Sequence, residues 1–264
     1  MSLTVGSLFS GIGGFDLGLE RAGMRVIWQS EIDPYASAVL KKHWPHVPNH
    51  GDIRTITAAR VERPDLLCGG FPCQDVSLAG ARLGLEGERS GLWSEYARVI
   101  GELEPRFVVV ENTPGLLSLG MDAVLAQLAA LGFDAEWHCI PASALGAPHV
   151  RDRVWILAYP SSSGLSAGRQ VQERAESIQS VLASGGNHQP VAGPWEASGT
   201  WEEPRLVESP LGSTVDGVSR RLVRIANRGA LETLGNAIVP QIAEIIGRAI
   251  LTAQPDHTDQ EGGR

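Results

Sequence analysis

The stretch SLFSGIGGFDLGL, residues 7–19, contains a turn with three glycines between an apolar segment and an amphipathic one. Before the turn, LTVGSLF is typical of a β-strand, and after it FDLGLERAG is typical of a helix that ends at Gly23. Glycines let a backbone approach a ligand closely, and the N-terminus of a helix favours negative charge. The stretch therefore predicts a strand–turn–helix unit, in which the turn either binds a ligand or is only a tight connection.

Outward from this unit, short β-branched runs alternate with amphipathic stretches through the first half of the chain. Further strands are expected at residues 24–30, 64–70 and 105–112, a helix at 121–132, and two antiparallel strands at 133–140 and 153–159. This alternation predicts an α/β fold with a Rossmann-like, doubly wound and mostly parallel sheet. From residue 160 to about 210, Ser, Gly, Pro, Gln and Glu dominate, which predicts a loop-rich insert. An apolar-periodic helix is expected again after that insert.

The composition is that of an ordinary globular protein. A length of 264 residues suits one large domain, or one domain with a small insert. No run approaches the roughly 18 apolar residues of a membrane helix, and the N-terminus lacks the pattern of a signal peptide. The three cysteines, Cys68, Cys73 and Cys139, are an odd number without metal-like spacing. We therefore expect a cytoplasmic protein without a disulfide framework, a metal or a membrane partner.

The charge distribution leaves the partner open. A net charge of −8 argues against a nucleic-acid partner, but residues 151–229 hold nine arginines and only eight acidic residues. The chain has just two lysines, so almost all of its positive charge is guanidinium, which suits phosphates and guanine edges.

Two acidic residues are candidates for binding a nucleoside. Glu31 lies 20 residues beyond Gly11, at the end of the second expected strand, where an acid accepts hydrogen bonds from ribose hydroxyls in doubly wound folds. Asp52, in the stretch HGDI, is suited to accept from an adenine amino group or, equally, to cap a short helix.

Four further residues are candidates for chemistry. Cys73 follows the third expected strand, at the sheet edge where active sites of such folds gather, and is either a nucleophile or a structural thiol. Glu111 ends the next strand and is either an active-site acid or a turn former. Arg151 and Arg153 share one face just before the last strand, where they either lie on the surface or hold an anion such as Glu111.

Five stretches together resemble the DNA cytosine-C5 methyltransferase family. They are SLFSGIGGFDLGLERAG, GGFPCQDVS, ENTPGL, RDRVWILA and LGNAIVPQIAEII, and they occur in the order of that family between residue 7 and about residue 250. The pair formed by Pro-Cys-Gln and Glu-Asn is the most specific part. The chain departs from the family pattern at Thr113 and His149, neither of which replaces a group with a chemical role.

The resemblance implies a role for each matching residue. Cys73 corresponds to the nucleophile, Glu111 to the acid that holds the cytosine N3, and Arg151 with Arg153 to the paired catalytic arginines. The implied contacts to S-adenosylmethionine are Phe9, Ser10, Gly11, Gly13, Gly14, Phe15, Glu31, Ile32, Asp52, Ile53, Pro72, Leu92 and Asn236. The implied or candidate contacts to DNA are Gln74, Ser77, Arg82, Arg220, Arg221 and Arg224.

The resemblance also implies a function and a division of the chain. It implies a monomeric enzyme of restriction-modification type that methylates C5 of a flipped-out cytosine in duplex DNA. The alternatives are methylation of structured RNA and a non-catalytic DNA-binding relative. We expect a catalytic S-adenosylmethionine-dependent methyltransferase fold over residues 1–160, a target-recognition region over 161–228, a returning C-terminal segment over 229–254 and a tail over 255–264.

Overall fold

The computed structural model describes residues 2–72, 91–147, 150–161 and 236–252. The predicted recognition region therefore lies outside the described residues except for Ser161, and its boundaries remain predictions.

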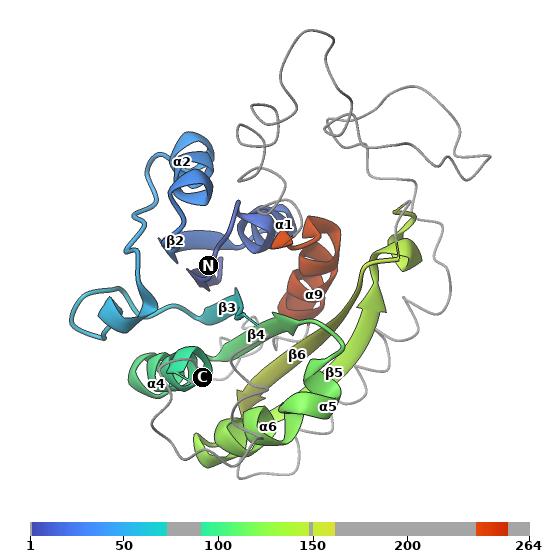
Figure 1. The fold of residues 1–264 in the computed structure, drawn as a ribbon. Coiled ribbons are helices and arrows are strands. Elements are labelled where there is room, and N and C mark those ends of the chain that lie inside the picture. Colours follow the sequence, from blue (N-terminus) through green and yellow to red (C-terminus); the bar gives the residue numbers. More distant parts are fainter. Residues whose placement is uncertain (1, 73–90, 148–149, 162–235, 253–264) are drawn as a thin grey trace, which may run out of the picture.

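A six-stranded sheet forms the centre of the molecule, in the order β2-β1-β3-β4-β6-β5 (Figure 1). The strands β1 to β4 run parallel, whereas β6 is antiparallel to both of its neighbours, β4 and β5. Their bounds are Thr4–Leu8 for β1, Arg25–Ser30 for β2, Leu66–Gly70 for β3, Phe107–Asn112 for β4, Phe133–Pro141 for β5 and Asp152–Pro160 for β6. The predicted mostly parallel sheet with an antiparallel end is confirmed.

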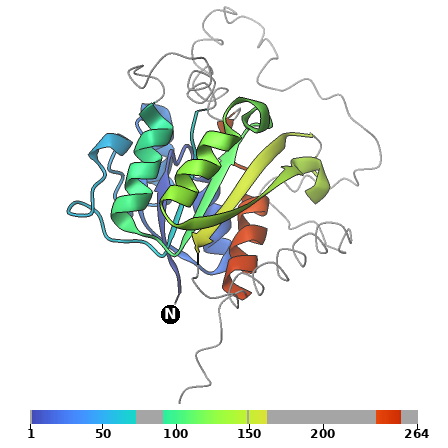
Figure 2. The ribbon, with the colours of Figure 1, turned by 90° about the horizontal axis from the view of Figure 1, so that it is seen from below.

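Helices cover both faces of this sheet (Figure 2). One hydrophobic cluster combines the sheet with α4 and α6, and a second one combines it with α1 and α9. The helix bounds are Gly14–Ala22 for α1, Pro34–His43 for α2, Gly91–Leu103 for α4, Leu116–Leu119 for α5, Met121–Ala130 for α6 and Pro240–Thr252 for α9. Two short 3-10 helices are η1, Ile53–Thr55, and η2, Ala142–Leu145. The doubly wound arrangement follows because each sheet face buries apolar side chains against a helix layer.

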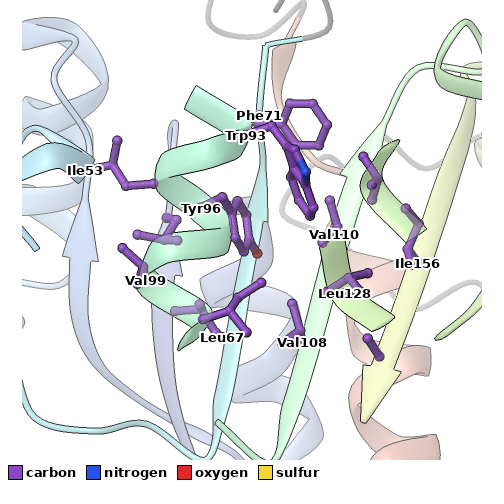
Figure 3. Close-up of a cluster of buried hydrophobic side chains, with 14 of the residues drawn as sticks. Ile53, Leu67, Phe71, Trp93, Tyr96, Val99, Val108, Val110, Leu128 and Ile156 are labelled. Atoms are coloured by element: carbon purple, nitrogen blue, oxygen red, sulfur yellow. The ribbon is translucent and has the colours of Figure 1, made fainter. Parts of the chain in front are cut away.

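The cluster beneath α4 anchors the chain on its way out of β3 (Figure 3). Trp93 packs between Phe71 and Tyr96, with ring centroids 5.1 and 5.5 Å away. Phe71 is buried and directly follows β3, so the chain enters the Pro72–Cys73 stretch from a position fixed by aromatic packing.

The C-terminal helix α9 packs against the N-terminal helix α1. The contact is close because small residues face each other: a Cβ on Gly18 would lie 2.3 Å from the carbonyl oxygen of Pro240. A Cβ on Gly247 would likewise lie 2.8 Å from the Cβ atom of Ala22. Residues far apart in the sequence thus meet beside the glycine-rich turn.

The strand order places a topological switch point at the carboxyl ends of β1 and β3, the position at which open α/β sheets form their ligand-binding crevice. The chain leaves β1 for β2 on one side, and β3 pairs with β1 on the other, so connections diverge at this point. Ligands of open α/β sheets bind at such a switch point. The glycine-rich turn, Glu31 and Pro72 follow strands that end on this side, and Glu111 is the penultimate residue of β4, which ends there too.

Among the helices that the structure describes, none combines the length and apolar character needed to cross a bilayer.

Candidate active site

The glycine-rich turn has a backbone that few other residues could adopt. Gly11 and Gly13 have φ angles of 55° and 86°, and Phe9 lies in the same left-handed region with φ 49°. A Cβ on Gly13 would also lie 2.4 Å from the ring of Trp44. The side chain of Ser10 donates to the carbonyl oxygen of Ser7 over 2.9 Å, which fixes the start of the turn. A non-glycine residue that keeps this conformation at a crevice is a strained position typical of ligand sites.

Glu31 joins the turn to the next helix. Its Oε2 accepts a hydrogen bond from the backbone N–H of Gly11 over 2.8 Å, and its Oε1 accepts one from Asp33 over 2.7 Å. The neighbouring Ile32 is 72% exposed, which is unusual for an apolar side chain at a crevice. Both features fit the predicted nucleoside-binding role, because a carboxylate keeps lone pairs for further donors and an exposed apolar side chain can pack on a base.

Asp52 caps a short helix, one of the two alternatives left open by the sequence. Its Oδ1 accepts from the backbone N–H of Arg54 over 3.0 Å at the start of η1, and its Oδ2 lies 3.6 Å from the guanidinium of Arg54. Behind it, Arg98 of α4 donates to the carbonyl oxygens of Ile53 and Ile56, over 3.1 and 2.9 Å. The cap leaves the carboxylate partly exposed, so it is compatible with an adenine contact as well.

A buried carboxyl group supports the turn from below. Asp16, in the first turn of α1, accepts hydrogen bonds from Ser7 of β1 over 3.0 Å and from Gln29 of β2 over 2.6 Å. Burial raises the pKa of Asp16 to about 6, and the two hydrogen bonds only partly offset this effect. The group ties α1 to two strands directly beneath the turn.

The buried Glu111 forms an ion pair with the partly buried Arg153 at the carboxyl end of β4. The Nε of Arg153 lies 3.0 Å from Oε1 of Glu111, and Glu111 is only 8% exposed. Burial raises the pKa of Glu111 to about 7, although the charges of Arg153 and Arg151 act in the opposite direction. A raised pKa of this kind suits a carboxyl group that exchanges a proton.

The space around Glu111 is set by the neighbouring strand. A Cβ on Gly70 would lie 2.7 Å from Oε2 of Glu111, so only glycine leaves room for that carboxylate oxygen. Asn112, buried next to it, donates to the carbonyl oxygen of Phe71 over 3.0 Å. The acid on β4 is thereby tied to the chain that leads from β3 toward Cys73.

Arg151 connects this acid to the C-terminal segment. Its Nη2 donates to the carbonyl oxygen of Ala237, and its φ of 34° is another strained position. Burial and then the charge of Arg153 lower the pKa of Arg151. The segment that precedes α9 also closes on the turn, because a Cβ on Gly14 would lie 2.5 Å from the carbonyl oxygen of Ile238.

Several of the predicted cofactor-binding residues pack into the hydrophobic core. Phe15 is 2% exposed and packs edge-on against Trp155, at 5.4 Å between ring centroids. Ile53 is buried and Leu92 packs against the core beneath α4. Their cofactor contacts remain predictions, as does that of the exposed Asn236. The predicted residues Cys73, Gln74, Ser77, Arg82, Arg220, Arg221 and Arg224 lie outside the described residues.

Sequence reasoning missed several residues that shape the site. Gly70 and Asn112 lie inside motifs that were recognised, but the motifs do not reveal what each side chain contacts. Asp16 had a signal, since it is an acidic residue among the apolar positions of α1. Asn49, which contacts Glu31, had none. Within the parts of the chain that the structure describes, no group of three or more His, Cys, Asp or Glu is placed to hold a metal ion.

Comparisons with known proteins identify relatives of this chain. The Type II methyltransferase M2.BsuMI of Bacillus subtilis (strain 168) is 38% identical over 164 residues, which cover 59% of this chain and 42% of that protein. A DNA N-6-adenine-methyltransferase of Escherichia phage P1 is 41% identical over 149 residues, covering 51% of this chain and 20% of that one.

A solved structure of a methyltransferase has a similar fold. A crystal structure described as a DNA modification methyltransferase encoded within an E. coli prophage has a TM-score of 0.51 and 28% identity, and covers 61% of this chain and 47% of that chain. The present chain spans less than half the length of each of these three proteins.

The family itself is identified by a match over most of the chain. The model of the C-5 cytosine-specific DNA methylase family matches residues 3–191 of the 264. This range includes the glycine-rich turn, Glu31, Glu111 and Arg153, whose arrangement is described above. The chain therefore belongs to the C-5 cytosine-specific DNA methylase family.

Proposed function

We propose that this protein transfers a methyl group from S-adenosylmethionine to C5 of a cytosine in duplex DNA, through a covalent adduct between Cys73 and C6. The observation that carries the proposal is the ion pair between the buried Glu111 and Arg153. It lies one strand away from the end of β3, from which the chain continues to Cys73, and beside the switch point of the sheet.

The residues around the glycine-rich turn fit S-adenosylmethionine. Glu31 offers a carboxylate to the ribose hydroxyls, Ile32 an apolar surface to the adenine, and Asp52 an acceptor to its amino group. The positive φ at Gly11 and Gly13 and the helix N-terminus behind them let the backbone come close to the polar part of the ligand. When bound there, S-adenosylmethionine supplies an electrophilic methyl group.

On the cytosine, the chain's own residues would make C5 reactive. The Cys73 thiolate forms a bond to C6, and the electron pair of the C5–C6 double bond moves toward C5 and, through C4, onto N3. Glu111 holds a proton at N3 and so stabilises the charge that develops on the ring, while Arg153 holds Glu111 in place. After methyl transfer, loss of the C5 proton to a base, with water as the simplest candidate, restores the double bond and releases the thiolate.

A cytosine stacked in a duplex cannot reach this crevice, so the base must be flipped out. We propose that residues 161–228 recognise the target sequence, with arginines such as Arg220 contacting phosphates or guanine edges. The names of the relatives include Type II methyltransferases, which supports a role in restriction and modification inside a bacterial or phage-infected cell. A monomer suffices for one active site.

The test is transfer of tritiated methyl from S-adenosylmethionine to mixed-sequence duplex DNA, followed by nucleoside chromatography and bisulfite sequencing. We expect label in 5-methylcytosine within one short sequence, and none with the Cys73→Ser variant. Cys139→Ser is the matched control, because Cys139 is an exposed thiol on β5 that the mechanism does not use.

Three outcomes would contradict the proposal. Label in N6-methyladenine would assign the activity named for the phage P1 relative. Label only in structured RNA would assign the RNA substrate. Binding of DNA without any transfer, while cofactor still binds, would assign a non-catalytic role.

A further inference from the structure

We infer that Asn49 is a positioning residue that fixes Glu31 for its contact with the ribose of the cofactor. The inference rests on the proposed function, because it assigns the ligand of Glu31. Asn49 lies 18 residues from Glu31 in the sequence, in the segment that precedes the HGDI stretch.

The side-chain amide of Asn49 forms hydrogen bonds with both the N–H and the carbonyl oxygen of Glu31. Its Oδ1 accepts from the N–H of Glu31 over 3.0 Å, and its Nδ2 donates to the carbonyl oxygen of the same residue, also over 3.0 Å. The Nδ2 further donates to the hydroxyl of Ser37 over 3.1 Å, and that hydroxyl itself donates to the carbonyl oxygen of Glu31 over 3.2 Å.

Glu31 needs this support because it has no strand of its own. The strand β2 ends at Ser30 and α2 begins at Pro34, so the backbone of Glu31 takes part in neither element. Its carboxylate must nevertheless reach from the end of β2 to the N–H of Gly11, in the turn that follows β1. A residue outside regular structure holds one direction only if its peptide groups are bonded elsewhere.

Asn49 can provide that support since its own backbone is fixed to β2. It forms an isolated parallel bridge with Gln29, whose N–H donates to Pro48 over 2.9 Å, and the N–H of His50 donates back to Gln29 over 2.8 Å. The amide thus extends from a segment paired with the sheet to the first residue beyond the sheet.

A purely local role would leave the bonds to Glu31 unexplained. Oδ1 of Asn49 also accepts from the N–H of Gly51 over 3.1 Å, a contact two residues away that shapes the turn. The contacts to Glu31 span the two segments that carry the predicted ribose-binding and adenine-binding acids, Glu31 and Asp52. One side chain therefore sets the spacing between the two halves of the nucleoside site.

The experiment is calorimetric titration of the full chain with S-adenosylhomocysteine and with its analogue lacking both ribose hydroxyls. For Asn49→Ala we expect binding of S-adenosylhomocysteine to weaken about tenfold, the size of a lost hydrogen-bond anchor. The penalty should shrink to less than about twofold on the analogue, because Glu31 then has no hydroxyl to meet. In methyl transfer, KM for S-adenosylmethionine should rise while kcat stays within about twofold.

Two further variants test the individual hydrogen bonds to the Glu31 backbone, and a third variant is the matched control. Ser37→Ala removes a single bond to the Glu31 carbonyl oxygen and should weaken binding less than Asn49→Ala. Asn49→Asp keeps an acceptor for the Glu31 N–H but places a carboxylate oxygen against the Glu31 carbonyl oxygen, so it should weaken binding at least as much as Asn49→Ala. His46→Ala changes an exposed residue of the same loop and should bind like the wild type.

The outcomes separate this inference from the proposed function. Equal penalties on both ligands, or wild-type binding by Asn49→Ala, would overturn the positioning role while leaving the proposed function intact. Failure of the wild-type protein to bind S-adenosylhomocysteine at all would overturn the proposed function and this inference together.

Discussion

Two glutamates at the carboxyl ends of strands of the same sheet have opposite surroundings. Glu31 is partly exposed, and its carboxylate oxygens accept from the backbone N–H groups of Gly11 and Asp33. Glu111 is buried, and its partner is the guanidinium of Arg153. Two backbone N–H groups fix the direction of the Glu31 side chain, whereas burial raises the pKa of Glu111 to about 7, which suits it to exchange a proton. The same residue type is suited to binding in one place and to proton transfer in the other.

Replacing each glutamate by glutamine should separate the two roles most strongly. Glu111→Gln keeps the shape of the side chain but removes the exchangeable proton, so we expect kcat to fall by about 10²–10⁴ with little change in cofactor affinity. Glu31→Gln should instead weaken cofactor binding and leave kcat at saturation nearly unchanged. Single-turnover methyl transfer and calorimetric titration measure the two quantities. If both variants lose kcat alone, the division of roles is wrong.

Crowding Glu111 from the neighbouring strand should have the next largest effect. In Gly70→Ala the new Cβ would lie 2.7 Å from Oε2 of Glu111, which forces the carboxylate to move. A displacement of this kind lowers the rate about 10²-fold when it misplaces a reacting group. Gly91→Ala is the control, since no atom lies within 4 Å of a Cβ there. Activity of Gly70→Ala equal to that of the control would show that the carboxylate has room to shift without consequence.

Removing the cation beside Glu111 should change the pH dependence. Arg153 lowers the pKa of Glu111, so Arg153→Gln should raise that pKa further above its usual range. Since the protonated carboxyl holds N3, activity is lost as pH rises through this pKa, and the alkaline limb of kcat/KM should move upward by about one pH unit. Arg63→Gln, which breaks an exposed pair with Glu104 (3.2 Å apart), should leave the limb in place. A downward shift in Arg153→Gln would reverse the assigned protonation state.

The smallest effect concerns a third carboxyl group, Asp16, which is buried like Glu111 but has only neutral donors. Its pKa is raised from 3.8 to about 6 in the folded protein, so the folded state loses stability as pH rises through this range. Asp16→Asn removes the charge and should raise the free energy of unfolding by about 1–3 kcal/mol at pH 8, but hardly at pH 4. Urea unfolding at both pH values measures this difference.

The control for Asp16 is Asp122→Asn, because Asp122 lies in the first turn of α6 but is exposed. It should show no comparable gain at pH 8. A loss of stability in Asp16→Asn at pH 8 would mean that the negative charge itself is required by Ser7 and Gln29.

Most elements of the fold were predictable, because their signals are local. The helix α1 ends at Gly23 with φ 103°, and α6 ends just before Gly132 with φ 83°, as the glycines indicated. The pairing of β5 with β6 followed from two adjacent apolar segments. Burial was harder to predict: local patterns did not indicate that Phe15 is only 2% exposed and packs against Trp155, in a cluster that combines α1, α9 and the sheet.

The sequence by itself determined which residue types stand at which strand ends, and therefore that Glu31, Glu111 and Arg153 are candidates for one site. Periodicity and glycine placement act within a few residues, so they can be read along the chain. Only the tertiary structure decided the environment of each group. The decisive contacts join residues that lie 9 to 42 positions apart in the sequence. They are the ion pair of Glu111 with Arg153, the hydrogen bonds of Asp16 to two strands and the hydrogen bonds of Asn49 to the backbone of Glu31. Burial and partners set the pKa and direction of a carboxyl group, and both arise only when distant segments pack together.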